Sequence, residues 1–547
     1  MPSLREFRAQ VDALLSAGTL FEAMDQYAII FFNVENFKHY NQYYGYPAGD
    51  TFLEHMASAV VESFPQRLVA RATADQFVVL AKADEVVEGI SKVRTAFRRE
   101  HKDTSIWLRA GYYALGRHDA DAGVACDRAK AACDELRGRR DAYMREYDDV
   151  LQHRIIWRRY VLEFFDEAIK RGWIRAFCQP IIRVATGETC DVEVLARWID
   201  PGEGVMPPVE FIPVLEEARL VHLLDLAVLR DACRACRELV DAGKPYIPMS
   251  VNLSRLDFEL CDIVAEVTKI LDEYRIPYQN VAVELTESAL TGNQEFLREE
   301  VDRFRELGIE VWMDDFGSGY SSLNVLKDYT FDMVKIDMAF LRGLEDGGNA
   351  PIMLAKVVDM AKELGIKTLV EGVETQEQYE FLRSLGCGRA QGYLFGKPSP
   401  LPESIEGLAN DAHPPVEPLA KHSFYEDVGR VNLMRPDPHP YIDGRYMPSD
   451  VAAAIIRRRG GKDEYLNTNG LFAEFLAETG EEFTEDCRAA IRRCIDSGEW
   501  EEYLVRRREE TYTVRARLIS EAREYQAFAV LLVVDAYYRS NRRGDGE

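Results

Sequence analysis

Apolar residues along the chain occur in short runs that alternate with amphipathic stretches, and the pattern is most regular between residues 174 and 405. There, brief apolar strands alternate with helical repeats, which is typical of the βα units of a TIM-type (β/α)8 barrel. The eight expected strands are Phe177–Ile182, Asp191–Arg197, Pro248–Leu253, Val281–Leu285, Val311–Asp314, Met333–Ile336, Thr368–Val370 and Arg389–Tyr393.

The regions before and after this segment have different patterns. The first mixes strands and helices and contains a predicted hairpin, which indicates an α+β domain. A stretch rich in Arg, Glu and Asp at helical spacing follows, and a proline-rich stretch leads from the barrel into a last, smaller α+β unit. We therefore predict an α/β multidomain protein. Its parts are 1–120, a helical connector at 121–172, the barrel at 173–408, a linker at 409–421 and the last unit at 422–538.

Composition excludes several classes of protein. The 547 residues carry a formal net charge of −26, which disfavours binding to nucleic acid. No apolar run approaches the roughly 18–20 residues of a membrane span, and the N-terminus lacks a signal-peptide pattern. The ten cysteines are scattered, and the one CxxC, Cys233 with Cys236, lies in a helical pattern without a second pair. We expect a cytoplasmic protein without a membrane span and without a zinc site at these cysteines.

Polar residues gather at the carboxyl ends of the predicted barrel strands. Barrel enzymes build their active sites from this end of several strands. One acidic residue there would be explained by helix capping, whereas seven converging ends require a cation, because crowded carboxylates repel each other. The residues are Glu193, Asn252, Glu284, Glu287, Asp314, Asp315, Lys335, Glu371, Glu374 and Gln391.

The chemistry of these side chains favours hard divalent cations. The ligands offered are oxygens, which suit Mg²⁺ or Mn²⁺ better than zinc. The adjacent Asp314 and Asp315 suit two ions about 3.5–4 Å apart, the arrangement used for in-line attack on phosphodiesters. Lys335 adds a charge that can hold a hydroxide or a phosphate oxygen. The loop at 317–319 is predicted to move and to close the site or carry a signal to it.

With these motifs, residues 174–405 resemble the EAL domain, the cyclic di-GMP phosphodiesterase family. The signature Glu-Ala-Leu is present as Glu193-Val194-Leu195. Val194 in place of alanine is expected to tune the rate and to leave the ligand in place. The resemblance implies that metal-activated water opens cyclic di-GMP to linear pGpG. The alternative is an EAL-fold receptor that binds the dinucleotide without cutting it.

The resemblance also implies a role for single residues and for a partner. A homodimer that pairs through the barrel near the loop after Asp315 is expected. The implied metal ligands are Glu193, Asn252, Glu284, Asp314, Asp315 and Glu371, and the implied catalytic residues are Glu193, Lys335, Asp315 and Glu371. The implied substrate contacts are Gln179, Arg197 and Gln391, and the implied loop-stabilising residues are Glu287 and Glu374.

The first segment resembles the GGDEF domain of diguanylate cyclases in a degenerate form. Its signature appears at residues 73–77 as Thr-Ala-Asp-Gln-Phe, so that side chains replace both glycines and hinder the approach of a triphosphate. Asn33 replaces the metal-binding aspartate, and we expect no cyclase activity. The family's guanine contacts fall on Asn41 and Asp50. Two interpretations remain open: GTP acts as a regulator, or the domain is a relic used in dimer packing.

Residues 422–538 are similar to PAS-type sensor domains in the order and size of their elements. No His or Cys is clearly placed to hold haem or flavin. A ligand-free interaction or dimerisation module is therefore expected.

Overall fold

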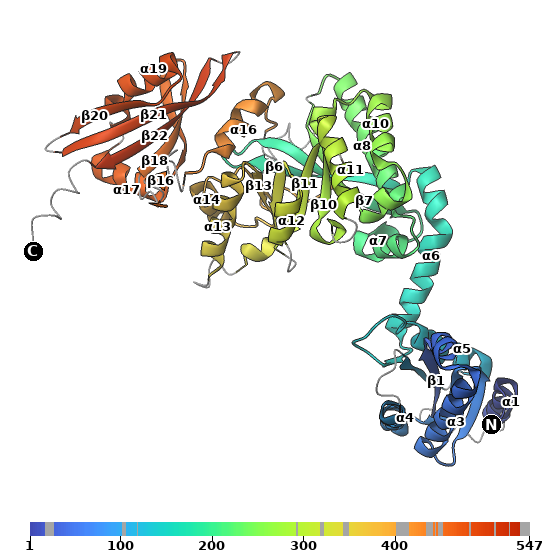
Figure 1. Cartoon of the computed structure of the whole chain (residues 1–547). Helices are drawn as coiled ribbons and strands as arrows, with labels where there is room; N and C mark the ends of the chain where they lie inside the picture. Colours follow the sequence, from blue (N-terminus) through green and yellow to red (C-terminus); the bar gives the residue numbers. More distant parts are fainter. Residues whose placement is uncertain are drawn as a thin grey trace, which may run out of the picture. The chain divides into compact units, whose positions relative to one another are not determined.

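The structure is a computed structural model that describes residues 1–16, 27–100, 106–116, 119–244, 246–290, 294–317, 322–342, 349–400, 415–433, 441–442, 445–446, 452–480, 483–507, 510–523 and 526–536. It divides into two compact units, Met1–Tyr160 and Val161–Glu547, which are described separately (Figure 1). Within these ranges no helix is both long enough and apolar enough to cross a membrane.

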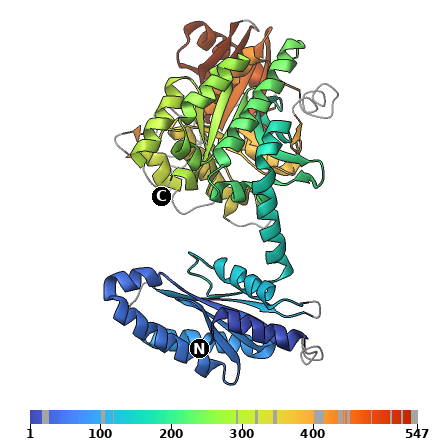
Figure 2. The same ribbon diagram turned by 90° about the vertical axis from the view of Figure 1, so that its right-hand side faces the viewer.

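The first unit is one five-stranded sheet with helices on both faces (Figure 2). The strand order is β2-β3-β1-β4-β5, antiparallel except for the β4–β5 pair. Successive residues of β1 point to opposite faces, so Ile30 and Phe32 join one core and Ile29 and Phe31 the other. The elements are α1 (Leu4–Ser16), β1 (Tyr27–Glu35), α2 (Phe37–Tyr44), α3 (Tyr46–Ser63), β2 (Leu68–Thr73), β3 (Gln76–Lys82), α4 (Val86–Glu100), β4 (Trp107–Ala114), α5 (Ala122–Asp134) and β5 (Met144–Glu146).

The expected connector at 121–172 is only partly a connector. Helix α5 buries Ala125, Cys126 and Ala129 against the first sheet, and β5 pairs with β4. The expected boundary at residue 120 is therefore too early, because these elements complete the core and the edge of the first unit. The long helix of the prediction is α6 (Asp149–Arg171).

The second unit contains a closed barrel at the predicted strands. The order is β6-β14-β13-β12-β11-β10-β9-β7, and pairing of β6 with β7 closes the ring. The strands are β6 (Ile174–Arg183), β7 (Thr189–Asp200), β9 (Met249–Leu253), β10 (Val281–Thr286), β11 (Glu310–Phe316), β12 (Met333–Ile336), β13 (Lys367–Val370) and β14 (Arg389–Gln391), with β8 (Gly204–Met206) and β15 (Ser399–Pro400) at the margins. The covering helices are α7 (Pro208–Glu217), α8 (Val221–Asp241), α9 (Arg255–Leu260), α10 (Ile263–Tyr274), α11 (Gln294–Glu306), α12 (Ser322–Asp328), α13 (Ala350–Glu363) and α14 (Gln376–Ser384).

One strand departs from the expected (β/α)8 pattern. Strand β6 runs antiparallel to both of its neighbours, β7 and β14. Only residues 184–188 connect β6 to β7, and so short a connection forms a hairpin, whereas a parallel pair needs a crossover. The C-terminal end of β6 therefore lies at the barrel edge opposite the C-terminal ends of the other strands.

The C-terminal part of the second unit is a five-stranded antiparallel sheet in the order β19-β18-β22-β21-β20, and Figure 1 shows α16 between this sheet and the barrel. Its elements are α16 (His422–Arg430), β16 (Tyr441–Ile442), β17 (Arg445–Tyr446), β18 (Ala452–Arg459), β19 (Lys462–Thr468), α17 (Gly470–Thr479), α18 (Phe483–Asp486), α19 (Arg488–Ser497), β20 (Glu501–Arg507), β21 (Glu510–Ala522) and β22 (Ala527–Ala536).

The expected linker at 409–421 is wrong for its described part, residues 415–421. Thr189 donates a backbone hydrogen bond to Pro415, and Glu417 donates one back to Thr189, at 2.7 and 2.8 Å. The Glu417 side chain is fully buried. Packing of this kind fixes the segment against the barrel, whereas a linker would be solvated. Residues 409–414 lie outside the described residues.

Candidate metal centre and active site

Lys335 lies at the centre of the acidic residues that the strand ends supply. It is 1% exposed, and its Nζ ion-pairs with four carboxylates that lie in or directly after β7, β10, β11 and β13. The distances are 2.5 Å to Glu284 Oε2, 2.8 Å to Glu371 Oε1, 2.9 Å to Asp314 Oδ1 and 3.5 Å to Glu193 Oε1. The structure therefore gathers side chains separated by up to 178 residues at one mouth of the barrel.

A backbone irregularity places Asp314 and Asp315 on the same site. Adjacent strand residues normally point to opposite faces. Here the pairing of β11 with β12 shifts register between Met313 and Phe316, and Asp315 adopts a left-handed φ of 56°. Carboxylate oxygens of Asp314, Asp315 and Glu371 consequently lie within 4.8 Å of one another. This strained turn is what allows one strand to supply two neighbouring acids.

Amide side chains hold Glu193 from two directions. Asn252 Nδ2 donates to Glu193 Oε1 at 3.1 Å, and Gln391 Nε2 donates to Glu193 Oε2 at 2.6 Å. Gln391 Nε2 also lies 3.1 Å from Gln179 Oε1, and Gln179 donates to the carbonyl of Gly396 at 3.2 Å. Gly392 permits this packing, because a Cβ there would lie 2.1 Å from the Val373 carbonyl oxygen.

The electrostatics of the carboxylate cluster, defined as Glu193, Glu284, Asp314, Asp315 and Glu371, favour bound cations. Five carboxylates face one ammonium group, Lys335, so the formal charge is −5 + 1 = −4. Burial raises the pKa of Glu284, and burial with the nearby Asp314 raises that of Asp315. Burial, only partly opposed by Lys335, raises the pKa of Glu371 to about 7. Two divalent cations would neutralise this charge.

Unsatisfied oxygen atoms support the same conclusion. Within the described part of the chain, the buried Glu284 Oε1 and Gln391 Oε1 accept no hydrogen bond. Buried acceptors without a partner are rare and costly. Oxygen ligands with an excess of negative charge are what Mg²⁺ and Mn²⁺ prefer. The residues present therefore fit a centre for hard divalent cations.

Arg197 lies beside this centre and is available for an anionic ligand. Its guanidinium lies 5.6 Å from the centre of the Phe177 ring and donates to the Ala196 carbonyl at 2.7 Å. No carboxylate of the described residues forms an ion pair with it within 4.0 Å. Burial lowers the pKa of Arg197, and a phosphate partner would offset this desolvation.

The two predicted loop-stabilising residues are placed differently. Glu287 is buried, in the 3₁₀ turn Glu287–Leu290 that follows β10. Glu374 is exposed, and its backbone N–H hydrogen-bonds to Gln378 Oε1 at the start of α14. Of the predicted mobile loop, residues 318 and 319 lie outside the described residues. Gly317 has a φ of 97°, and a Cβ there would lie 2.2 Å from the Phe340 ring.

One acidic residue near the site was not singled out from the sequence. Asp337 follows Lys335 by two residues, accepts a hydrogen bond from the Ala339 N–H at 2.8 Å, and contributes to the raised pKa of Asp315. The two-residue spacing after Lys335, in the sequence VKID, was the available signal.

In the first unit, the degenerate signature forms a hairpin end closed by its own side chains. Gln76 Nε2 donates to Asn33 Oδ1 at 3.2 Å, and Thr73 Oγ1 donates to Gln76 Oε1 at 2.8 Å. Asn41 lies on α2, where its Oδ1 is buried without a hydrogen bond from the described residues, and Asp50 is exposed on α3. Neutral amides thus stand where a metal site would need carboxylates.

Comparisons with known proteins agree with this arrangement. The EAL domain model matches residues 163–398, and the model of the diguanylate cyclase GGDEF domain matches residues 3–141. An uncharacterized signaling protein of Caulobacter vibrioides is 31% identical over 407 residues, which are 72% of this chain and 49% of that protein. The cyclic di-GMP phosphodiesterase NbdA of Pseudomonas aeruginosa is 29% identical over 411 residues, 72% of this chain and 52% of that protein.

Among solved structures, the PaMucR phosphodiesterase in complex with c-di-GMP is 31% identical and covers 45% of this chain and 99% of that one, with a TM-score of 0.42. The chain spans about half the length of the curated relatives that it matches first. The family matches and the barrel geometry coincide in the same residues. The chain therefore carries an N-terminal GGDEF domain followed by an EAL domain.

Proposed function

We propose that the EAL domain hydrolyses cyclic di-GMP to linear pGpG with the help of two Mg²⁺ or Mn²⁺ ions. The observation that carries the proposal is the carboxylate cluster around Lys335, whose formal charge of −4 favours bound divalent cations. The names of similar proteins, among them the cyclic di-GMP phosphodiesterases NbdA, PdeR and RocR, support the substrate.

The residues of the chain have separable tasks in this reaction. The cations, when bound, supply an activated water nucleophile and neutralise developing charge on the phosphate. Glu193 is held in one orientation by Asn252 and Gln391, so its two oxygens present a fixed geometry. Nearby carboxylates keep Lys335 protonated despite its burial, so it can stabilise a negatively charged phosphate oxygen. Arg197 would hold a phosphate of the substrate.

Nucleotide separation after incubation tests this proposal. The purified chain with cyclic di-GMP and Mn²⁺ or Mg²⁺ is expected to release pGpG, and chelation of the metal is expected to stop the reaction. Glu203→Gln is the matched control for site variants, because Glu203 is exposed in the turn after β7. Substrate that binds in equilibrium dialysis but stays uncut would identify a receptor and refute the enzyme.

We propose that the GGDEF domain of this chain makes no cyclic di-GMP and acts as a regulatory domain. The Asn33–Gln76–Thr73 hydrogen bonds support this, since neutral side chains occupy the positions of the metal site and of the glycines. Incubation with GTP and Mg²⁺ is expected to yield no dinucleotide. A GTP titration tests regulation through Asn41 and Asp50. Unchanged thermal stability and unchanged hydrolysis would leave the domain only a packing role.

We further propose that the chain pairs as a homodimer and that its C-terminal sheet is a PAS-like interaction module. The order of its elements supports the likeness to PAS domains: strands β18 and β19 are followed by the short helices α17, α18 and α19 and then by strands β20, β21 and β22. Light scattering of the full chain is expected to give twice the 62.4 kDa of one chain. A monomer at micromolar concentration would contradict the pairing.

A further inference from the structure

Residues beyond the EAL match pack against the barrel edge opposite the carboxylate cluster. Arg183 ends the antiparallel strand β6 at that edge and binds Glu417 through two hydrogen bonds, at 3.0 and 3.1 Å. After α16, the chain is fixed again, because Lys362 Nζ donates to the Val431 carbonyl at 2.6 Å and Asn432 donates to Asp359 at 2.7 Å. Helix α16 is thus anchored to the barrel before its first residue and after its last.

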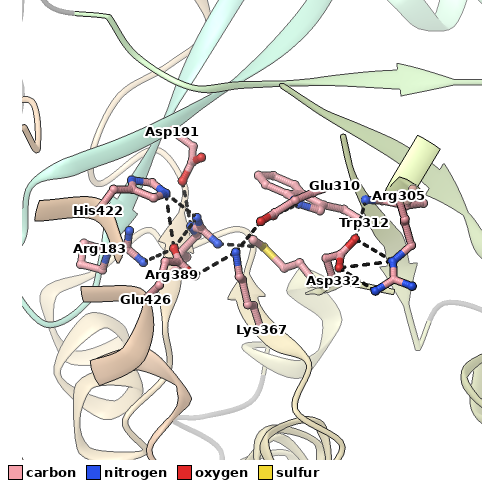
Figure 3. Close-up of polar contacts among 12 residues, drawn as sticks. Arg183, Asp191, Arg305, Glu310, Trp312, Asp332, Lys367, Arg389, His422 and Glu426 are labelled. Atoms are coloured by element: carbon pink, nitrogen blue, oxygen red, sulfur yellow. Dashed lines mark hydrogen bonds and ion pairs between the residues drawn. The ribbon is translucent and has the colours of Figure 1, made fainter. Parts of the chain in front are cut away.

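The carboxylate of Glu426, in the middle of α16, contacts side chains of three barrel strands, β6, β13 and β14 (Figure 3). Its Oε1 lies 2.8 Å from Arg183 Nη1 and 2.7 Å from Arg389 Nη2, and its Oε2 lies 3.0 Å from Lys367 Nζ. Burial alone would raise the pKa of Glu426, but the three cations hold it well below its ordinary value. Glu426 is therefore a charged group in the floor of the barrel.

A second ion pair lies between this floor and the layer of the proposed active site, along the same two strands. Arg389 Nε lies 2.8 Å from Asp191 Oδ2, and two residues further along the same strands Gln391 donates to Glu193 at 2.6 Å. Residues two apart on a strand share a face. The pairs therefore lie one above the other inside the barrel. Both connect β14 with β7 past the intervening strand β6.

The other face of α16 belongs to the C-terminal sheet. Phe424, Tyr425 and Val428 are fully buried in a core shared with residues of β18 and β22, such as Ile455 and Leu531. Polar contact continues on that side, because Ser520 donates to Asp427 at 2.8 Å. Helix α16 consequently contacts the barrel with one carboxylate and the sheet with the next.

We propose that Arg389 and Asp191 are positioning residues for Glu193 and Gln391, and that Glu426 makes α16 and the C-terminal sheet part of this support. The barrel floor is completed by chain from outside the EAL match. A change in the packing of the C-terminal sheet on α16 would reach the metal ligand Glu193 through Glu426, Arg389 and Asp191. The activity readout of this inference rests on the proposed phosphodiesterase function, whereas the metal-binding readout does not.

Glu426→Gln in the full chain is the direct test. Each cation keeps one carboxylate, since Arg183 retains Glu417, Arg389 retains Asp191 and Lys367 retains Glu310. The variant is therefore expected to fold. Its dissociation constant for Mn²⁺ alone, measured by calorimetry, is expected to rise about fivefold. That is less than the roughly 10–100-fold for residues that directly contact metal ligands. With substrate, kcat is expected to fall by about the same factor and KM to stay within about twofold.

Asp427→Asn is the matched control, because it removes the neighbouring carboxylate charge of α16, while the amide oxygen of the asparagine can still accept the hydrogen bond from Ser520. Its Mn²⁺ affinity and kcat are expected to equal those of the wild type. Equal values for Glu426→Gln and Asp427→Asn, with faster limited proteolysis near α16 in the former, would overturn the proposal. They would show that α16 can detach without affecting the site.

Arg389→Lys is a second variant that does not depend on the behaviour of α16. A lysine keeps the charge but cannot reach Asp191 and Glu426 at once, as the guanidinium fork does. Mn²⁺ affinity is expected to fall at least as much as in Glu426→Gln. Wild-type affinity in this variant would refute the positioning role. If both variants bind Mn²⁺ more weakly as expected but the wild-type chain hydrolyses no cyclic di-GMP, the proposed function is refuted and the inference stands.

Discussion

The two ends of the barrel both bury charged side chains, yet they balance them differently. At the end that holds the carboxylate cluster, here called the upper end, the ammonium group of Lys335 pairs with four carboxylates, and the fifth, Asp315, lies beside Asp314 and Glu371. In the ion-pair network around Glu426 at the opposite, lower end, three cations of the described residues face four carboxylates, and His422 contacts two of the four. The lower cations are Arg183, Lys367 and Arg389, and the lower carboxylates are Asp191, Glu310, Glu417 and Glu426.

This difference in charge balance distinguishes an end suited to binding a ligand from an end that stabilises the fold. Nearly balanced buried charges satisfy one another, so the lower end holds the fold together without a ligand. An excess of four formal negative charges favours added cations and, without them, raises the pKa of carboxyl groups such as Glu371, so the upper end is suited to binding metal at a cost in stability. Charge balance, more than the number of buried charges, thus distinguishes the two ends.

Loss of a ligand at the upper end should produce the largest change. Glu193→Gln is expected to lower turnover of cyclic di-GMP about 10⁴-fold, roughly 5.4 kcal/mol on the barrier, because it removes a charge from the metal centre. Initial rates of pGpG formation measure it, with Glu203→Gln as the control. Activity within tenfold of wild type would place the metal centre elsewhere.

Loss of a carboxylate at the lower end should instead destabilise the fold. Glu417→Gln is expected to lower the free energy of unfolding by about 3 kcal/mol, because Arg183 stays buried with one carboxylate in place of two. Urea denaturation followed by circular dichroism measures it. An unchanged transition would mean that this pair contributes nothing to stability.

Metal binding at the upper end should depend on pH through Glu371, whose pKa is raised to about 7. Metal must displace this proton, so Mn²⁺ affinity is expected to rise about fivefold from pH 6 to 7 and about tenfold in all by pH 8, where it levels off. The stability of the metal-free fold depends on pH in the opposite direction from the metal affinity. The stabilisation from a raised pKa is complete below the unfolded value near 4.3 and is lost as pH rises through about 7. Calorimetric titrations at several pH values test this, and Glu371→Gln should remove the step.

The smallest expected effect is a gain in stability. Asp314→Asn reduces the negative excess, while Lys335 keeps three other carboxylates. In the presence of a chelator, the variant is expected to be more stable than wild type by about 1 kcal/mol and to lose the stabilisation by Mn²⁺. Glu310→Gln, at the balanced end, should be destabilised. Equal losses of unfolding free energy in Asp314→Asn and Glu310→Gln would contradict the distinction between the two ends.

Local pattern was sufficient to predict the strands of the barrel and the residues at their ends. Apolar runs of strand length with polar residues at or near their ends predict Glu193, Glu284, Asp314 and Lys335 at one mouth, and the structure brings the three carboxylates within 3.5 Å of Lys335 Nζ. The end of the first unit was predicted too early, because helical spacing in α5 does not reveal which sheet the helix covers. The hairpin between β6 and β7 is indicated by its short connection, although the alternation of strands and helices predicts another βα unit there.

The sequence by itself determined which side chains could form the site, since strand period and strand ends are local properties of the chain. Only the tertiary structure decided the antiparallel closure by β6, the left-handed turn at Asp315, and the burial of Glu417 and Glu426 beneath the barrel. Each of these depends on contacts between distant segments; Arg183 and Glu426, for example, are 243 residues apart. A glutamate in a proline-rich stretch has the local pattern of a solvated linker. Whether it is buried depends on the cations that the fold brings to it.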